Sequence, residues 1–234
     1  MQTLRARGLS RRIAIMSIEA VIFDWGGTLT QWAPVELEDM WQVAAELRMW
    51  DRVNQTQHAG TLSEILADAS RALGLDVAGA VLGEVATRHL DAWTPHMQHH
   101  DDALPTLKAL NAAGLKLGLL SNTHWPATFH EHFLVRDGLA EWIHVRAYTS
   151  NMRHSKPHRE TFMHVLGQLG VAPDKAVMVG DRPIDDVWGG QQVGMRGIWR
   201  PHPQCPPLGN VVPDAVIQRL DELPALIETW SKNP

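Results

Sequence analysis

The sequence has very little cysteine and little lysine. Cys205 is the one cysteine among 234 residues, which excludes an intrachain disulfide and a zinc site built from several cysteines. A single cysteine fits a reducing compartment, so we expect a cytoplasmic protein. Five lysines and a net charge of −5 leave no basic excess to neutralise a nucleic-acid backbone. We therefore expect no nucleic-acid partner.

Long apolar runs are also absent. No window approaches the roughly 18 continuous apolar residues that a membrane span needs, so we expect no membrane partner. Apolar residues make up 44% and charged residues 20% of the chain, an ordinary globular mixture that excludes a disordered or collagenous protein. The length suits one large domain, or one domain with a smaller insertion. Residues 1–16 carry four arginines and no acid, and we expect them to form a disordered extension.

Short apolar runs predict the strands of a parallel sheet. The first run covers residues 20–24, ends in Asp24 and is followed by Trp25 and two glycines. Similar runs recur at 115–121, 176–180 and 197–199. Such runs suit strands that are buried on both faces. Helical patterns follow at 101–113, 125–133, 158–169, 184–193 and 221–230. This alternation predicts an α/β fold with a Rossmann-like open parallel sheet.

Residues 35–93 interrupt the alternation with three helix-like segments and no convincing strand. The first covers 35–49, and the second opens with Thr61 and Glu64 at the spacing of a capping box. In the third, apolar residues recur at a period of 3.6 between Val77 and Trp93. We therefore predict an α/β core made of 17–31 and 100–234, with an α-helical insertion at 32–99.

Acidic residues follow two of the predicted strands. Asp24 ends the first strand, and Asp181 follows the strand at 176–180, with Asp185 and Asp186 close behind. Ligands of open α/β sheets bind beyond the carboxyl ends of the strands, so we expect these carboxylates to share one site. Carboxylates are the ligands that Mg²⁺ prefers, and a carboxylate can also attack a phosphoryl group.

Groups that could hold a phosphate stand at matching positions. Ser121 ends the strand at 115–121, and Lys156 lies in a loop just ahead of a predicted helix. A hydroxyl can donate a hydrogen bond to a phosphoryl oxygen, and a lysine supplies a point charge. Phosphoryl transfer depends mainly on positioning and charge neutralisation, which this collection of residues can provide.

The order of these motifs resembles that of the haloacid dehalogenase superfamily of hydrolases. Four stretches carry the resemblance: Asp24-Trp-Gly-Gly-Thr-Leu29, Leu119-Leu-Ser-Asn-Thr123, Ser155-Lys-Pro157 and Val179-Gly-Asp-Arg-Pro-Ile-Asp-Asp-Val187. The resemblance implies that the insertion is a helical cap over the active site. It also implies three sets of roles: a nucleophile (Asp24); phosphate binding (Gly27, Ser121, Asn122, Lys156); and Mg²⁺ binding (Asp24, the carbonyl of Gly26, Asp181, Asp186). Both Asp185 and Asp186 have a spacing from Asp181 that relatives use, and the residues after them favour Asp186.

One position departs from the pattern of the phosphatases in this superfamily. They usually carry a second aspartate two residues after the nucleophile as general acid and base, and this chain has Gly26 there. General acid–base catalysis contributes roughly 10²–10⁴ in rate. We therefore expect weak turnover of alkyl phosphates and better turnover of acyl or aryl phosphates. The candidates for a replacement proton donor are histidines near the site (His96, His99, His100, His124).

Three functions remain open from the sequence. The first is a Mg²⁺-dependent, phosphatase-type hydrolase that acts on a small phosphorylated molecule through an aspartyl-phosphate on Asp24. The second is a 2-haloacid dehalogenase, because those relatives also lack the second aspartate and share the Ser121-Asn122 pair. The intact acids Asp181 and Asp186 argue against it. The third is a degenerate member that binds a phosphorylated ligand without turnover. The oligomeric state cannot be read from the sequence.

Overall fold

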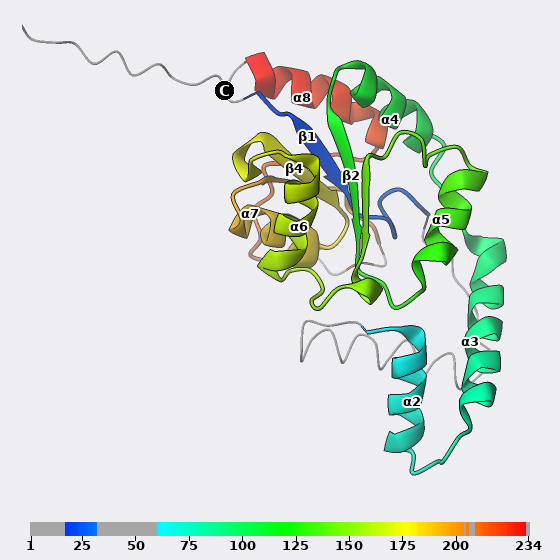
Figure 1. Ribbon diagram of the computed structural model, residues 1–234. Coiled ribbons are helices and arrows are strands. Elements are labelled where there is room, and N and C mark those ends of the chain that lie inside the picture. The colour runs from blue at the N-terminus through cyan, green and yellow to red at the C-terminus, as the bar shows by residue number, and fades with distance from the viewer. Residues whose placement is uncertain (1–16, 32–59, 204, 206–208, 233–234) are drawn as a thin grey trace, which may run out of the picture.

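Six parallel strands form one open sheet in the computed structural model, which describes residues 17–31, 60–203, 205 and 209–232 (Figure 1). The strand order is β3-β2-β1-β4-β5-β6, so β1 lies between β2 and β4. The strands are β1 (Ala20–Phe23), β2 (Lys116–Ser121), β3 (Val145–Tyr148), β4 (Ala176–Gly180), β5 (Arg196–Trp199) and β6 (Ala215–Val216). This architecture confirms the predicted Rossmann-like α/β fold.

Helices cover both faces of the sheet, which is why its central strands are apolar throughout. Val21 and Phe23 of β1 face a core shared with α4 (Ala103–Ala112), α5 (Ala127–Arg136) and α8 (Leu223–Lys232). Ala20 and Ile22 face a second core that includes α6 (Arg159–Leu169). In Figure 1, α4 and α8 lie on one side of the sheet, and α6 and α7 (Gly189–Gln192) lie on the other. Within the described residues, no helix combines the length and apolar character that a membrane crossing needs.

Two strands were not predicted from the sequence, and one predicted helix differs from the structure. β3 is four residues long and carries Arg146, and β6 has only two residues, so neither gives a recognisable apolar run. The helix predicted at 184–193 is a wide π-helical turn, Pro183–Trp188, followed by the short α7. Within this turn the carboxylate of Asp186 folds back, and its Oδ2 accepts a hydrogen bond from the Arg182 N–H at 3.0 Å.

Two described α-helices lie within residues 60–99, where the insertion was predicted. They are α2 (Leu62–Ala72) and α3 (Gly79–Trp93), which pack through a small apolar cluster and extend beyond one end of the sheet (Figure 1). Thr61 and Glu64 form the predicted capping box at the start of α2. Thr30 and His99 form an isolated antiparallel bridge at the base of the insertion. The predicted helix at 35–49 and the extension at 1–16 lie outside the described residues, and the insertion boundaries stay a prediction.

Candidate active site

Three buried carboxylates converge at the carboxyl ends of the central strands. Asp24 directly follows β1, Asp181 directly follows β4, and Asp186 belongs to the π-helical turn after β4. Each offers an oxygen, and these oxygens all lie within 4.8 Å of one another. The sheet explains the convergence, because β1 and β4 are adjacent and in register, with Phe23 opposite Val179. Hard oxygen donors at this spacing suit Mg²⁺.

Lys156 joins two of these carboxylates. Its Nζ donates to Asp24 Oδ1 and to Asp186 Oδ1, both at 2.6 Å, and the whole side chain is buried. Burial alone would disfavour the ammonium, but the two carboxylates outweigh it and raise the pKa of Lys156 above its ordinary value. Burial also raises the pKa of Asp24 to about 8, with Lys156 opposing and Asp186 and Asp181 adding to the rise. With Asp24 ionised, the three carboxylates and one ammonium carry two net negative charges, which a divalent cation would balance.

Asp186, and not Asp185, is the acid that faces Asp24. The Asp185 Oδ2 accepts from Arg182 Nε at 2.8 Å, whereas Asp186 is fully buried beside Lys156. Gly180 makes room for this arrangement, because a Cβ there would lie 2.1 Å from Asp186 Oδ2. The structure thus brings together the pair that the sequence favoured, Asp181 and Asp186.

Asn122 contacts the loop of Lys156 through both ends of its side chain. Its Oδ1 accepts from the Lys156 N–H at 2.8 Å, and its Nδ2 donates to the Lys156 carbonyl at 3.0 Å. The amide therefore positions the lysine, and its expected contact with a phosphate stays a prediction. Ser121, the last residue of β2, is buried at the same end of the sheet. Its contact with a phosphate stays a prediction.

In the turn after Asp24, Gly26 has free space beside it, and Gly27 is held by a hydrogen bond. A Cβ added to Gly26 would meet no atom within 4 Å. Gly27 has a φ of 77°, which favours glycine, and its carbonyl accepts from Arg200 Nη1 at 2.7 Å. The predicted roles of these two glycines, metal binding by the Gly26 carbonyl and phosphate binding at Gly27, remain predictions.

Two residues beside the site were not predicted from the sequence. Arg200 follows β5, is buried, and ties the turn at Gly27 to the sheet through its N–H bond to the Gly180 carbonyl. Its position directly after an apolar strand is the sequence signal that indicates it. Cys205 donates from Sγ to Asp181 Oδ2 at 2.7 Å. It lies in a proline-rich loop, and no sequence pattern indicates this contact.

The four candidate histidines occupy different environments. His99 accepts from the Trp25 indole at 3.3 Å and contacts Asp137 at 2.7 Å, so both ring nitrogens are engaged. Burial and nearby Arg200 lower the pKa of His100 to about 4, which leaves it neutral at pH 7. His124 is buried, and its Nε2 lies 3.4 Å from that of His89 on α3. His96 ends the short helical turn Thr94–His96 after α3. The replacement proton donor therefore stays a prediction.

Comparison with known proteins identifies the family. Residues 18–194 match the haloacid dehalogenase-like hydrolases. The chain belongs to this family. N-acetylmuramic acid 6-phosphate phosphatase of Pseudomonas aeruginosa is 28% identical over 189 residues, which cover 77% of this chain and 80% of that protein.

Solved structures of relatives share the fold. The crystal structure of a HAD phosphatase from Thermococcus onnurineus aligns with a TM-score of 0.64 and 24% identity over 90% of this chain and 98% of its own. A 2-haloacid dehalogenase from Pseudomonas syringae aligns with a TM-score of 0.62 and 24% identity over 91% of this chain and 99% of its own. At this identity the two structures support the fold alone, and they do not separate a phosphatase from a dehalogenase.

Proposed function

We propose that this hydrolase is a magnesium-dependent phosphatase that acts on a small phosphorylated molecule through an aspartyl-phosphate on Asp24. The convergence of Asp24, Asp181 and Asp186 around Lys156 is the observation that carries the proposal. Asp24, Asp181 and Asp186 would hold the metal, with the Gly26 carbonyl as a further ligand. Bound Mg²⁺ would offset the repulsion between the carboxylates and an incoming phosphate.

Asp24 is the nucleophile in this proposal. One carboxylate oxygen forms a bond to phosphorus while the bond from phosphorus to the leaving oxygen breaks, and water later hydrolyses the aspartyl-phosphate. Lys156 holds Asp24 in position and balances charge at the phosphoryl group. Asn122 fixes the main chain of Lys156, so it supports the same step from the next loop.

Gly26 limits the range of substrates. A glycine has no proton to give to the leaving oxygen, so an alkoxide would have to depart unprotonated. Aryl and acyl phosphates have leaving groups that are stable as anions, and we expect them to react faster than alkyl phosphates. The phosphatase activity of the Pseudomonas relative supports a small phosphorylated substrate, but its sugar phosphate does not identify the substrate of this chain.

A 2-haloacid dehalogenase is the second candidate. Gly26 favours it, because those relatives also lack the second aspartate. In that reaction Asp24 would displace halide from carbon without a metal. The burial of Asp181 and Asp186 next to Asp24 argues against it, because that chemistry gives the two acids no task. The third candidate, binding without turnover, is motivated by Gly26 alone.

Hydrolysis of p-nitrophenyl phosphate tests the proposal directly. We expect activity that requires Mg²⁺, disappears in EDTA and is abolished by Asp24→Asn. Asp185→Asn is the matched control, because Asp185 is a neighbouring, partly buried acid that pairs with Arg182 and lies outside the cluster. Activity that ignores both EDTA and Asp24→Asn would refute the proposal. Halide release from 2-chloropropionate in EDTA would establish the dehalogenase instead.

Tight, Mg²⁺-dependent phosphate binding without hydrolysis of any aryl, acyl or alkyl phosphate would indicate a degenerate member. Calorimetric titration with inorganic phosphate, with and without Mg²⁺, measures this binding on the same protein samples.

A further inference from the structure

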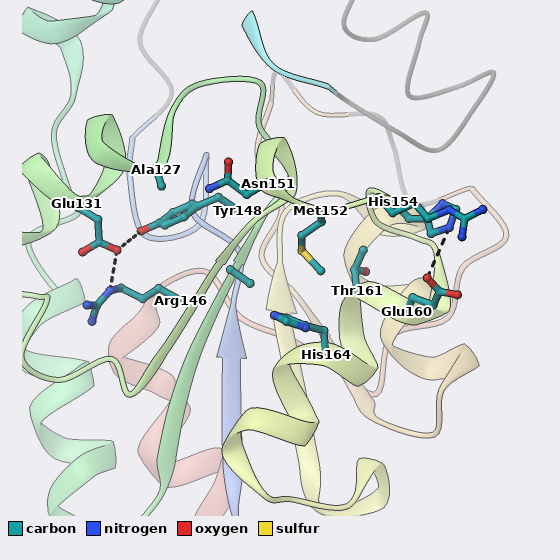
Figure 2. A pocket seen from close by; sticks show the side chains of 12 residues that line it. Ala127, Glu131, Arg146, Tyr148, Asn151, Met152, His154, Glu160, Thr161 and His164 are labelled. Carbon is teal, nitrogen blue, oxygen red and sulfur yellow. Dashed lines mark hydrogen bonds and ion pairs between the residues drawn. The ribbon is translucent and has the colours of Figure 1, made fainter. Parts of the chain in front are cut away.

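A second group of metal-ligating side chains lies on the segment that carries Lys156. His154 and His158 stand two residues before and two residues after this lysine, and Glu160 follows in the first turn of α6. Each of the three offers one ligand atom, and these atoms all lie within 4.8 Å of one another. Figure 2 shows His154 and Glu160 side by side at one end of a pocket of about 540 Å³, away from Glu131, Arg146 and Tyr148 at its other end.

The two imidazole rings are stacked. Their centroids are 3.7 Å apart and their planes differ by 15°. The stacking holds the two rings beside each other, so both lie close to one possible metal position. Neutral imidazole is the form that ligates a metal. Glu160 supplies a negative charge beside the pair, with its Oε2 3.5 Å from His154 Nε2.

The hydrogen bonds around the cluster leave ring nitrogens available for a metal. His154 Nδ1 is buried and has no hydrogen-bond partner within the described part of the chain. His158 Nδ1 accepts from the Glu160 N–H at a long 3.3 Å, which makes it a weak cap of α6. If His158 ligates through Nε2, its ring proton moves to Nδ1 and this cap is lost. Within the part of the chain that the structure describes, metal binding would replace this weak hydrogen bond and the contact between His154 Nε2 and Glu160 Oε2.

We propose that His154, His158 and Glu160 bind one zinc ion at a site separate from the carboxylate cluster. Two imidazoles and a carboxylate suit zinc, whereas three carboxylates suit magnesium. With zinc bonds of about 2.0–2.2 Å, the ligand atoms of a tetrahedral centre lie about 3.4 Å apart, so the present set must close by at most about 1.4 Å. The side chain of Glu160 is 67% exposed and free to make that movement. Zinc at this site ties together the two ends of the loop around Lys156.

Zinc binding in the presence of excess Mg²⁺ tests this site without relying on activity. Excess Mg²⁺ competes for the carboxylate cluster, so calorimetric titration with Zn²⁺ then reports on the histidine site. We expect one equivalent of zinc on the wild-type protein. The double variant His154→Ala/His158→Ala is expected to lose affinity by roughly 100-fold or more, since even outer-shell changes cost 10–100-fold. His164→Ala is the matched control, because His164 lies on α6, lines the same pocket and bonds Gln168.

Asp181→Asn distinguishes this site from zinc held near Cys205 and Asp181. We expect this variant to bind zinc as the wild type does. Three results would overturn the proposal: zinc binding unchanged in the double histidine variant, zinc binding lost in Asp181→Asn, or binding only at millimolar zinc. If the double variant does not fold, two other measurements test the site: zinc binding by Glu160→Gln and the visible spectrum of the wild-type protein loaded with Co²⁺. Weaker binding by Glu160→Gln and a tetrahedral cobalt spectrum are expected, and an octahedral spectrum would contradict the site.

Discussion

Replacing Gly26 by aspartate is expected to restore general acid catalysis. A Cβ at this position meets no atom within 4 Å, and the φ of Gly26 lies outside the left-handed region, so the backbone accepts a side chain without strain. The new carboxyl group would stand two residues after Asp24 in the same turn. General acid–base catalysis is worth about 10²–10⁴ in rate, equivalent to a barrier lower by about 3–5 kcal/mol. We expect a gain of this order for alkyl phosphates.

The gain should depend on the leaving group. p-Nitrophenolate leaves without a proton, so Gly26→Asp is expected to change its release much less than that of an alkyl alcohol. The assay compares phosphate release from p-nitrophenyl phosphate and from glycerol phosphate at saturating Mg²⁺. The expected result is a large rise in the ratio of alkyl to aryl turnover.

Two matched variants separate the proton from the added side chain. Gly26→Ala adds only a Cβ, and Gly26→Asn has the shape of aspartate without a proton to transfer. We expect both to keep the low alkyl rate of the wild type. Equal gains in Gly26→Asp and Gly26→Asn would contradict the reasoning. An alkyl rate in the wild type already close to the aryl rate would also contradict it, because another residue would then be supplying the proton.

Three further predictions concern stability and metal binding. In EDTA, Lys156→Met should lower the free energy of unfolding by about 3–5 kcal/mol, because it leaves buried carboxylates without their cation. In thermal melts, Mg²⁺ should then raise the Tm of this variant more than that of the wild type. A Tm in EDTA equal to that of the wild type would contradict this prediction. Gly180→Ala should weaken Mg²⁺ binding by displacing Asp186, whereas Gly26→Ala should leave Mg²⁺ binding unchanged. Titration with Mg²⁺ measures both variants, and equal affinities of Gly180→Ala and the wild type would contradict the prediction. Burial and nearby His124 lower the pKa of His130 from 6.5 to about 3, so the unfolded chain binds more protons below pH 6.5 and stability falls as the pH drops. From pH 8 to pH 5 the free energy of unfolding, measured with urea, should fall by about 2 kcal/mol through this group. If His130→Gln shows the same pH dependence as the wild type, another group is responsible.

The apolar runs made the sheet and the carboxylate cluster predictable. β1 and β4 are buried throughout, and so is β2 after the exposed Lys116, so their sequences are apolar up to a first polar residue that marks the end of each strand. Because parallel neighbours end at the same edge, Asp24 and Asp181 had to lie close together. β3 and β6 lack this signal, since one carries a charged residue and the other is only two residues long.

The supporting contacts of the site could not be predicted in the same way. Asn122 bonds the main chain of Lys156, and Arg200 bonds the carbonyl of Gly27, 173 positions away in the chain. Main-chain groups look alike in every residue, so a sequence does not show which of them a side chain will reach. His130 illustrates the same limit, because nothing in its neighbourhood of the sequence distinguishes a fully buried ring from a solvated one.

The charges at the site, rather than the fold, favour the phosphatase over the dehalogenase. The two reactions share the fold, since solved structures of a phosphatase and a dehalogenase align with this chain about equally well. Asp181 and Asp186 both raise the pKa of Asp24, so without a cation they oppose the ionised form that either reaction needs as a nucleophile. A divalent cation held by these acids would reverse this opposition, because it would favour ionised Asp24, and it would also attract a phosphate. These two acids therefore favour the proposed metal-dependent reaction over dehalogenation.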